Sequence, residues 1–122
     1  MKTLLLIGAI TLSLISFGQT SVKIGGLEVK TKDSGNEKKM HLAEAEKACA
    51  ALGKDWRLPT KEELNFLYEN MDEIGGFTND YYWSGTYFPP QDAWVQSFSR
   101  GAQYHQDGKY SDPNYVRAVR AF

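Results

Sequence analysis

The sequence has few of the residues on which most catalytic and metal sites depend. It contains one cysteine, Cys49, and two histidines, His41 and His105, among 122 residues. A single cysteine excludes an internal disulfide, and we expect it to be a buried thiol on a helix face. Two histidines are too few for an imidazole-rich metal site. The sequence therefore predicts no metal and no cofactor.

The sequence has no marked excess of positive or negative charge, since it contains 14 basic and 15 acidic residues. Nucleic-acid binding usually needs a basic patch, so we expect no nucleic-acid partner. No serine lies in an elbow motif beside a histidine and an acid, and the aspartates fall in turn-like stretches. We therefore predict that the protein is not an enzyme, although an unrecognised hydrolase is one alternative.

The chain has one long apolar run, residues 4–17, which follows the basic start Met1-Lys2. The run is too short for a comfortable membrane span, and Ser16 and Gly18 supply the small residues that a signal peptidase reads. We predict a signal peptide over 1–18, a single domain over 19–122 and no membrane span in the mature chain. The mature protein would be secreted, to the periplasm, the cell surface or the outside.

The sharpest local signal lies at residues 56–64, WRLPTKEEL. Pro59 keeps the preceding residue out of a helix, and Thr60 is a good N-cap. Glu63, three residues on, completes a capping box with Thr60. Arg57 follows Trp56, and we expect its partly buried head to pair with a carboxylate such as Glu63.

Apolar spacing predicts helices over about 41–52 and 61–71. Short alternating patterns predict strands within 21–32, 81–86, 93–99, 103–106 and 116–122, with Gly25-Gly26 as a turn. Asp107-Gly108 is typical of a hairpin turn, and Asp33 opens a turn cluster. The predicted order is strands, then two helices, then a further run of strands. This segregation indicates an α+β domain with an antiparallel sheet.

Several long side chains are predicted to have structural roles. Trp56, Trp83 and Trp94 lie beside apolar residues in strand-like contexts, and we expect all three in the core. Arg117 and Arg120 are three apart on a strand and should face opposite sides, one paired inside the fold and one solvated.

Ordered blocks cover nearly the whole mature chain: 24–29, 45–53, 56–64, 67–68, 74–77, 82–86, 93–94, Phe98, Gly101 and 116–120. In this order they resemble the DUF1566 family, also described as the Legionella collagen-like protein C-terminal (Lcl_C) domain family. One departure is Gly85, where that family more often has a second serine.

The resemblance implies a C-type-lectin-like fold, in which two helices pack on a twisted antiparallel sheet with irregular loops. It also implies a secreted or surface-exposed protein with a role in adhesion or glycan binding. Calcium-dependent sugar binding is not expected, because 90–92 and 112–114 only superficially match the lectin triplets and 94–96 lacks the ligands. Formylglycine-type oxidation is excluded, because it needs two reactive cysteines.

Aromatic and polar residues in the predicted loops are the candidates for ligand binding. Flat rings beside amides and carboxylates suit sugars and protein partners equally well. We expect a glycan or surface-protein ligand to bind through loops 87–92 and 100–115, or else a small structural or interaction subunit at the cell surface. The candidate residues are Tyr87, Gln91, Asp92, Tyr104, His105, Gln106 and Tyr110.

Overall fold

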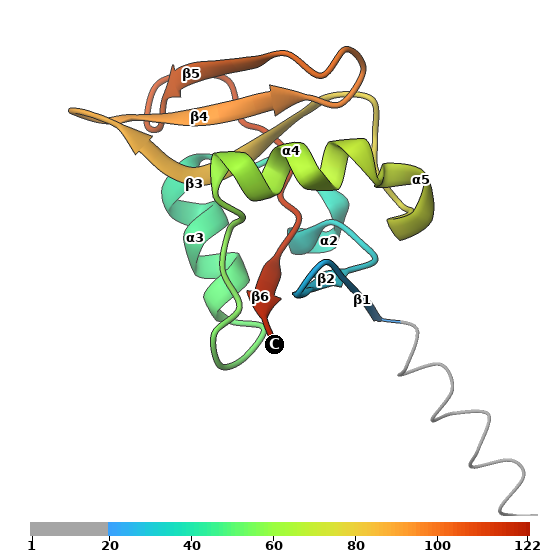
Figure 1. Ribbon diagram of the computed structural model, residues 1–122. Helices are drawn as coiled ribbons and strands as arrows, with labels where there is room; N and C mark the ends of the chain where they lie inside the picture. The colour runs from blue at the N-terminus through green and yellow to red at the C-terminus, as the bar shows by residue number, and fades with distance from the viewer. Residues whose placement is uncertain (1–19) are drawn as a thin grey trace, which may run out of the picture.

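The computed structural model describes residues 20–122, and the predicted signal peptide lies outside them. The described residues form two three-stranded antiparallel sheets with helices between and beside them (Figure 1). No helix in this part of the chain is long and apolar enough to cross a membrane. The elements are β1 (Ser21–Ile24), β2 (Leu27–Lys30), α2 (Ser34–Glu37), α3 (Leu42–Ala50), α4 (Lys61–Glu69), α5 (Met71–Ile74), β3 (Tyr81–Phe88), β4 (Asp92–Ser97), β5 (Gln103–Asp107) and β6 (Val119–Ala121).

The small sheet joins the two ends of the described chain. Its strand order is β1-β2-β6, so the last strand pairs with the second. Gly25 and Gly26 have φ of 58° and 81°, which glycine adopts without strain, and they form the predicted tight turn between β1 and β2. The N–H of Phe122 donates to Gly26 O at 3.3 Å, which fastens the C-terminal end to this turn.

The predicted capping box at the start of α4 is confirmed. Thr60 Oγ1 accepts from the N–H of Glu63 at 3.1 Å, and Glu63 Oε1 accepts from the N–H of Thr60 at 2.9 Å. Arg57 donates to both carboxylate oxygens of Glu63, at 2.6 and 3.1 Å, as expected. Hydrogen bonds from Arg57 lower the pKa of the Glu63 carboxyl. Pro59 accepts from the N–H of Gly85 at 2.7 Å and so joins this segment to β3.

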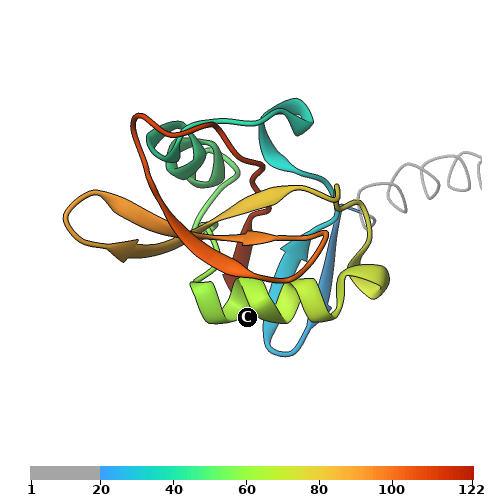
Figure 2. The same cartoon turned by 90° about the horizontal axis from the view of Figure 1, so that it is seen from above.

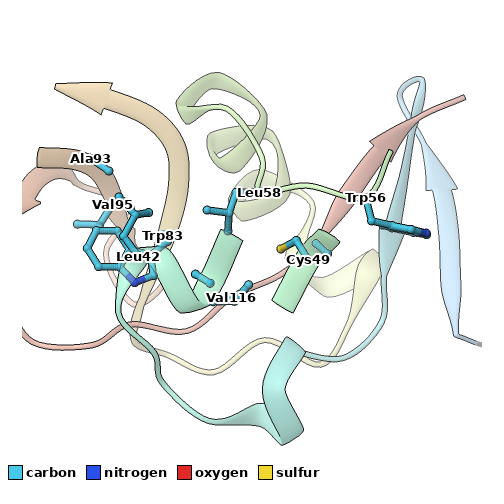
Figure 3. Close-up of a cluster of buried hydrophobic side chains, with 10 residues drawn as sticks. Leu42, Cys49, Trp56, Leu58, Trp83, Ala93, Val95 and Val116 are labelled. Atoms are coloured by element: carbon cyan, nitrogen blue, oxygen red, sulfur yellow. The ribbon is translucent and has the colours of Figure 1, made fainter. Parts of the chain in front are cut away.

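The larger sheet, β3-β4-β5, is covered on both faces. On the α3 face, Leu42, Ala45 and Cys49 of the helix belong to one buried cluster with Trp83, Ala93 and Val95, and Figure 3 shows Leu42 beside Trp83 and Val95. On the opposite α4 face, Leu64 and Leu67 pack with Tyr82 and Phe98. Figure 2 shows α3 and α4 on either side of the sheet. Two helices on one antiparallel sheet are the α+β arrangement that the sequence predicts.

The tryptophans and arginines follow the predictions with one exception. Trp56 and Trp83 are buried, and Lys30 and Arg120 each lie 4.6 Å from the Trp56 ring. Arg117 is fully buried, whereas Arg120 is 36% exposed and pairs with Glu28 on the small sheet. The prediction that Trp94 is core is wrong, because its side chain is only partly buried and belongs to neither hydrophobic cluster.

Two turn assignments also need correction. Asp107-Gly108 ends β5 but forms no hairpin, because the chain runs on to Asn114 and Tyr115, which bridge to Met40 and Tyr82 instead. Asp33 opens a turn, as expected, and this turn has left-handed backbone at Gly35 and Asn36, but Asp33 is itself buried. Its carboxylate accepts from Tyr82 Oη at 2.8 Å and from Arg117 Nε at 2.9 Å, a role that turn composition does not reveal.

Candidate functional site: an aromatic platform on the β3–β4 hairpin

Three rings from three strands meet at the end of the larger sheet that projects beyond the helices. Phe88 is the last residue of β3, and Trp94 and His105 are directly opposite each other in β4 and β5. Phe88 is likewise opposite Asp92. Side chains at opposed positions share a face, and Trp94 shares its face with Gln96, so this group lies on the α4 face. We call Phe88, Trp94 and His105 the aromatic platform.

The platform rings touch one another closely. Phe88 and His105 stack in parallel, with ring centroids 3.9 Å apart and an interplanar angle of 4°. Trp94 meets both edge-on, at 5.8 Å from Phe88 and 5.4 Å from His105. Lys61, at the start of α4, places its Nζ 3.6 Å from the Trp94 centroid, a cation–π contact. Phe88 remains 42% exposed, so the platform presents apolar ring surface to solvent.

The exposure of Trp94 has a simple physical cause. Alternation along β4 turns Ala93 and Val95 toward α3, where both are fully buried. Trp94 and Gln96 turn to the α4 face, and only the position nearer α4 is covered: Gln96 donates to Asn65 at 2.8 Å. Trp94 lies two residues further out along the strand, where Lys61, the first residue of α4, lies over its ring.

Polar atoms lie at the rim of the platform. His105 Nδ1 is 2.7 Å from Asp92 Oδ2, which holds the imidazole against Phe88 and leaves Nε2 without a hydrogen-bond partner among residues 20–122. The Asp92 side chain is 27% exposed and that of His105 is 41% exposed. An apolar surface with a carboxylate and an imidazole at its edge can stack against a ring and hydrogen-bond its substituents.

A groove of about 570 Å³ lies on the other side of the hairpin, against the first turn of α3. Tyr87 and Gln91 line it from the hairpin, and Leu42, Glu44 and Glu46 line it from α3. Tyr87 Oη donates to Glu46 at 2.8 Å, and this hydrogen bond raises the pKa of Tyr87.

The seven predicted ligand-binding residues therefore do not form one site. His105 belongs to the platform and Asp92 lies at its rim, whereas Tyr87 and Gln91 line the groove on the opposite face. The other three lie elsewhere: Tyr104 packs edge-on against Tyr81 at 6.2 Å, Gln106 accepts from Asn114 at 2.8 Å, and Tyr110 is 75% exposed in the loop after β5.

Sequence reasoning missed Phe88, Trp94 and Lys61 as site residues. The position of Phe88 directly before Pro89-Pro90 was a usable signal. A large ring at the end of a strand has few core residues beside it against which it can pack. The position of Lys61 over Trp94 depends on how α4 packs on the sheet, which local patterns do not encode.

Within residues 20–122, no group of three or more histidine, cysteine, aspartate or glutamate side chains could hold a metal ion. Cys49 is fully buried, and burial raises the pKa of its thiol to about 12, which keeps it protonated. A protonated buried thiol is a poor nucleophile, so this residue is a packing element of α3.

Comparison with known proteins agrees with this architecture. Botrocetin has a crystal structure similar to this chain, with a TM-score of 0.60 and 14% sequence identity over 84% of this chain and 97% of botrocetin. EMS16, described as an antagonist of the collagen receptor integrin alpha2beta1, gives a TM-score of 0.60 and 13% identity over 84% of this chain and 98% of EMS16. At these identities the likeness shows the fold alone, which is C-type-lectin-like.

No curated protein matches this chain in sequence. A family model does match: the Lcl C-terminal domain model covers residues 20–120, nearly the whole described chain. The protein belongs to the Lcl C-terminal domain family.

Proposed function

We propose that this protein is a secreted, non-catalytic recognition domain that binds a glycan or protein ligand through the β3–β4 hairpin. The observation that carries the proposal is the aromatic platform, whose three rings belong to neither hydrophobic cluster. Because the three rings lie outside both clusters, the hydrophobic core does not depend on them. Exposed aromatic rings that are held rigidly by their neighbours are typical anchors of binding surfaces.

Geometry supports the platform as the primary contact, with loop 87–92 beside it. The Phe88–His105 stack is held by the contact of Asp92 with His105 and by the edge-on contacts of Trp94, so a ligand would not have to order these side chains. Pre-organisation of this kind reduces the entropic cost of binding. The mixture of ring faces and rim hydrogen-bonding atoms suits a sugar ring or a peptide side chain.

The test is a binding screen of the purified protein against a glycan panel and a panel of cell-surface proteins, followed by variants of the platform. Phe88→Ala and His105→Ala should each weaken capture of a hit at least tenfold while the melting temperature changes by only a few degrees. Tyr110→Ala is the matched control, because Tyr110 is a more exposed ring outside the platform.

Three outcomes would contradict the proposal. If both platform variants bind as well as the unchanged protein, the ligand contacts another surface. If Tyr110→Ala abolishes capture while Phe88→Ala does not, the loop after β5 is the binding site. If changes to the residues that line the groove abolish capture while Phe88→Ala does not, the binding site is the groove on the α3 face.

A further inference from the structure

The outer edge of β5 is unusually open. The order β3-β4-β5 makes β5 an edge strand, and Figure 1 shows no element beyond it. The other edge of this sheet is not open, because Tyr115 exchanges hydrogen bonds with the backbone of β3 at both Trp83 N and Tyr81 O, each at 3.0 Å. The sheet therefore has one covered edge and one free edge.

The register identifies which backbone groups point outward. Gly108 N donates to Gln91 O, and Ser97 N donates to Ala102 O, so these two pairs are hydrogen-bonded at either end of the ladder. Hydrogen-bonded and non-hydrogen-bonded pairs alternate in an antiparallel ladder. The residues that turn their N–H and C=O groups away from β4 are therefore Gln103, His105 and Asp107.

Nothing in β5 protects this edge. Natural edge strands usually carry a lysine, a proline or a bulge that prevents further pairing. The β5 sequence, QYHQD, has neither residue, and its register with β4 has no shift. Only its last position is partly covered, because Ser111 Oγ donates to Asp107 O.

We infer that the β5 edge pairs antiparallel with β5 of a second copy of this chain, about a two-fold axis at Tyr104. In this register Gln103 and His105 of each copy exchange backbone hydrogen bonds, and the partly covered Asp107 is not required. Tyr104 of one copy lies opposite Tyr104 of the second copy at a non-hydrogen-bonded position, where opposed side chains are closest. The ring, now 49% exposed, gains a cross-strand aromatic partner.

Charge favours a second copy over an unrelated strand. Arg100 precedes the edge, is exposed and makes no ion pair within residues 20–122, whereas Asp107 ends it with a carboxylate whose pKa is lowered by the N–H groups of Tyr110 and Lys109. An antiparallel self-pair brings the Arg100 of each copy toward the Asp107 of the other. A two-fold pairing places each of these charges near an opposite charge through one surface.

The arrangement places two platforms on one side of a continuous six-stranded sheet, because opposed residues of neighbouring strands share a face. The interface is a short strand edge well below the area of stable dimers, so we expect a weak, concentration-dependent dimer. This inference does not depend on the proposed function, because it uses the strand edge rather than the platform surface.

Sedimentation velocity of the purified protein from about 10 µM to about 1 mM should show a monomer–dimer equilibrium. Tyr104→Lys, which sets two cations opposite each other, and Arg100→Glu should each raise the dimer Kd about tenfold or more. Leu52→Lys adds a lysine at an exposed residue after α3, away from the β5 edge, and should leave Kd unchanged. A protein that stays monomeric throughout, or a dimer equally weakened by Leu52→Lys, overturns the inference.

Cross-linking tests the register. Tyr104→Cys should give a covalent dimer under mild oxidation, since opposed Cβ atoms at a non-hydrogen-bonded position are close enough for a disulfide. Cys49 is buried and will not compete. Tyr110→Cys is the control and should give no covalent dimer. Cross-linking through His105→Cys but not Tyr104→Cys would overturn the Tyr104-centred pairing.

Discussion

Arg117 and Asp33 are 84 positions apart in the chain and form a fully buried ion pair, with Arg117 Nη2 2.9 Å from Asp33 Oδ1. The Arg117 guanidinium also donates to Lys30 O and Gly75 O, at 3.0 and 2.9 Å, and lies 3.8 Å from the ring of Phe77. The pair thus connects β2, the segment after α5 and the chain that leads into β6.

Removal of one partner of this pair should destabilise the protein strongly. Asp33→Ala leaves a buried guanidinium without its carboxylate, and we expect a loss of about 3–5 kcal/mol in the free energy of unfolding. The double variant Asp33→Ala/Arg117→Met should lose much less than the sum of the two single changes. Urea denaturation of all three variants measures this, and additive losses would show that the pair is not coupled.

The capping box and its ion pair should depend on pH. The pKa of Glu63 is lowered from its ordinary value of 4.5. The stability that its carboxylate contributes is therefore complete above pH 4.5 and is lost as the pH falls through the folded-state pKa. A double-mutant cycle of Arg57→Ala and Glu63→Ala should give a coupling of roughly 0.5–1 kcal/mol at neutral pH.

The same cycle at a pH well below 4.5 should give no coupling. Thr60→Ala should cost about 1 kcal/mol, the usual loss for an N-cap. Glu62→Ala removes an exposed neighbouring carboxylate and serves as the control. A coupling that persists in acid would mean that Arg57 and Glu63 interact through packing rather than charge.

The two sheet tryptophans should differ sharply in their effect on stability. Trp83→Ala empties a fully buried position and should cost about 3–5 kcal/mol. Trp94→Ala removes a partly exposed ring and should cost only about 1 kcal/mol. Chemical denaturation of both variants decides the matter, and equal losses would place Trp94 in the core after all.

The Cys49 thiol should be unreactive in the folded protein. Its pKa is raised to about 12 by burial, so almost no thiolate exists at neutral pH. A thiol reagent such as DTNB should modify it only after denaturation, and a reductant should not move the melting temperature. Fast modification of the native protein would reveal an opening motion of α3 against the sheet.

Local signals explain how much of the fold could be predicted. The capping box, the Gly25-Gly26 turn and the two helices rest on residues within a few positions of each other, and the sequence predicts them all. The buried role of Asp33 could not be predicted, because its partners, Tyr82 and Arg117, are distant in the chain.

The site was predicted less well for a related reason. Period-two alternation shows which residues of β4 share a face, but it does not show how far a helix covers that face. Trp94 was therefore assigned to the core, although the buried leucines of α4 pack at the Phe98 end of that face. Loop composition likewise selected Tyr87 and His105 without showing that they lie on opposite faces of one sheet.

The small sheet has a practical consequence for experiments. Thr20 leads into β1 and Phe122 follows β6, so both ends of the described chain leave from one sheet, away from the projecting β3–β4 hairpin (Figure 1). A tag or surface tether fused after Phe122 would therefore hold the protein with its platform directed outward. Immobilisation through that end should preserve ligand capture, whereas random lysine coupling would consume Lys61 beneath the Trp94 ring.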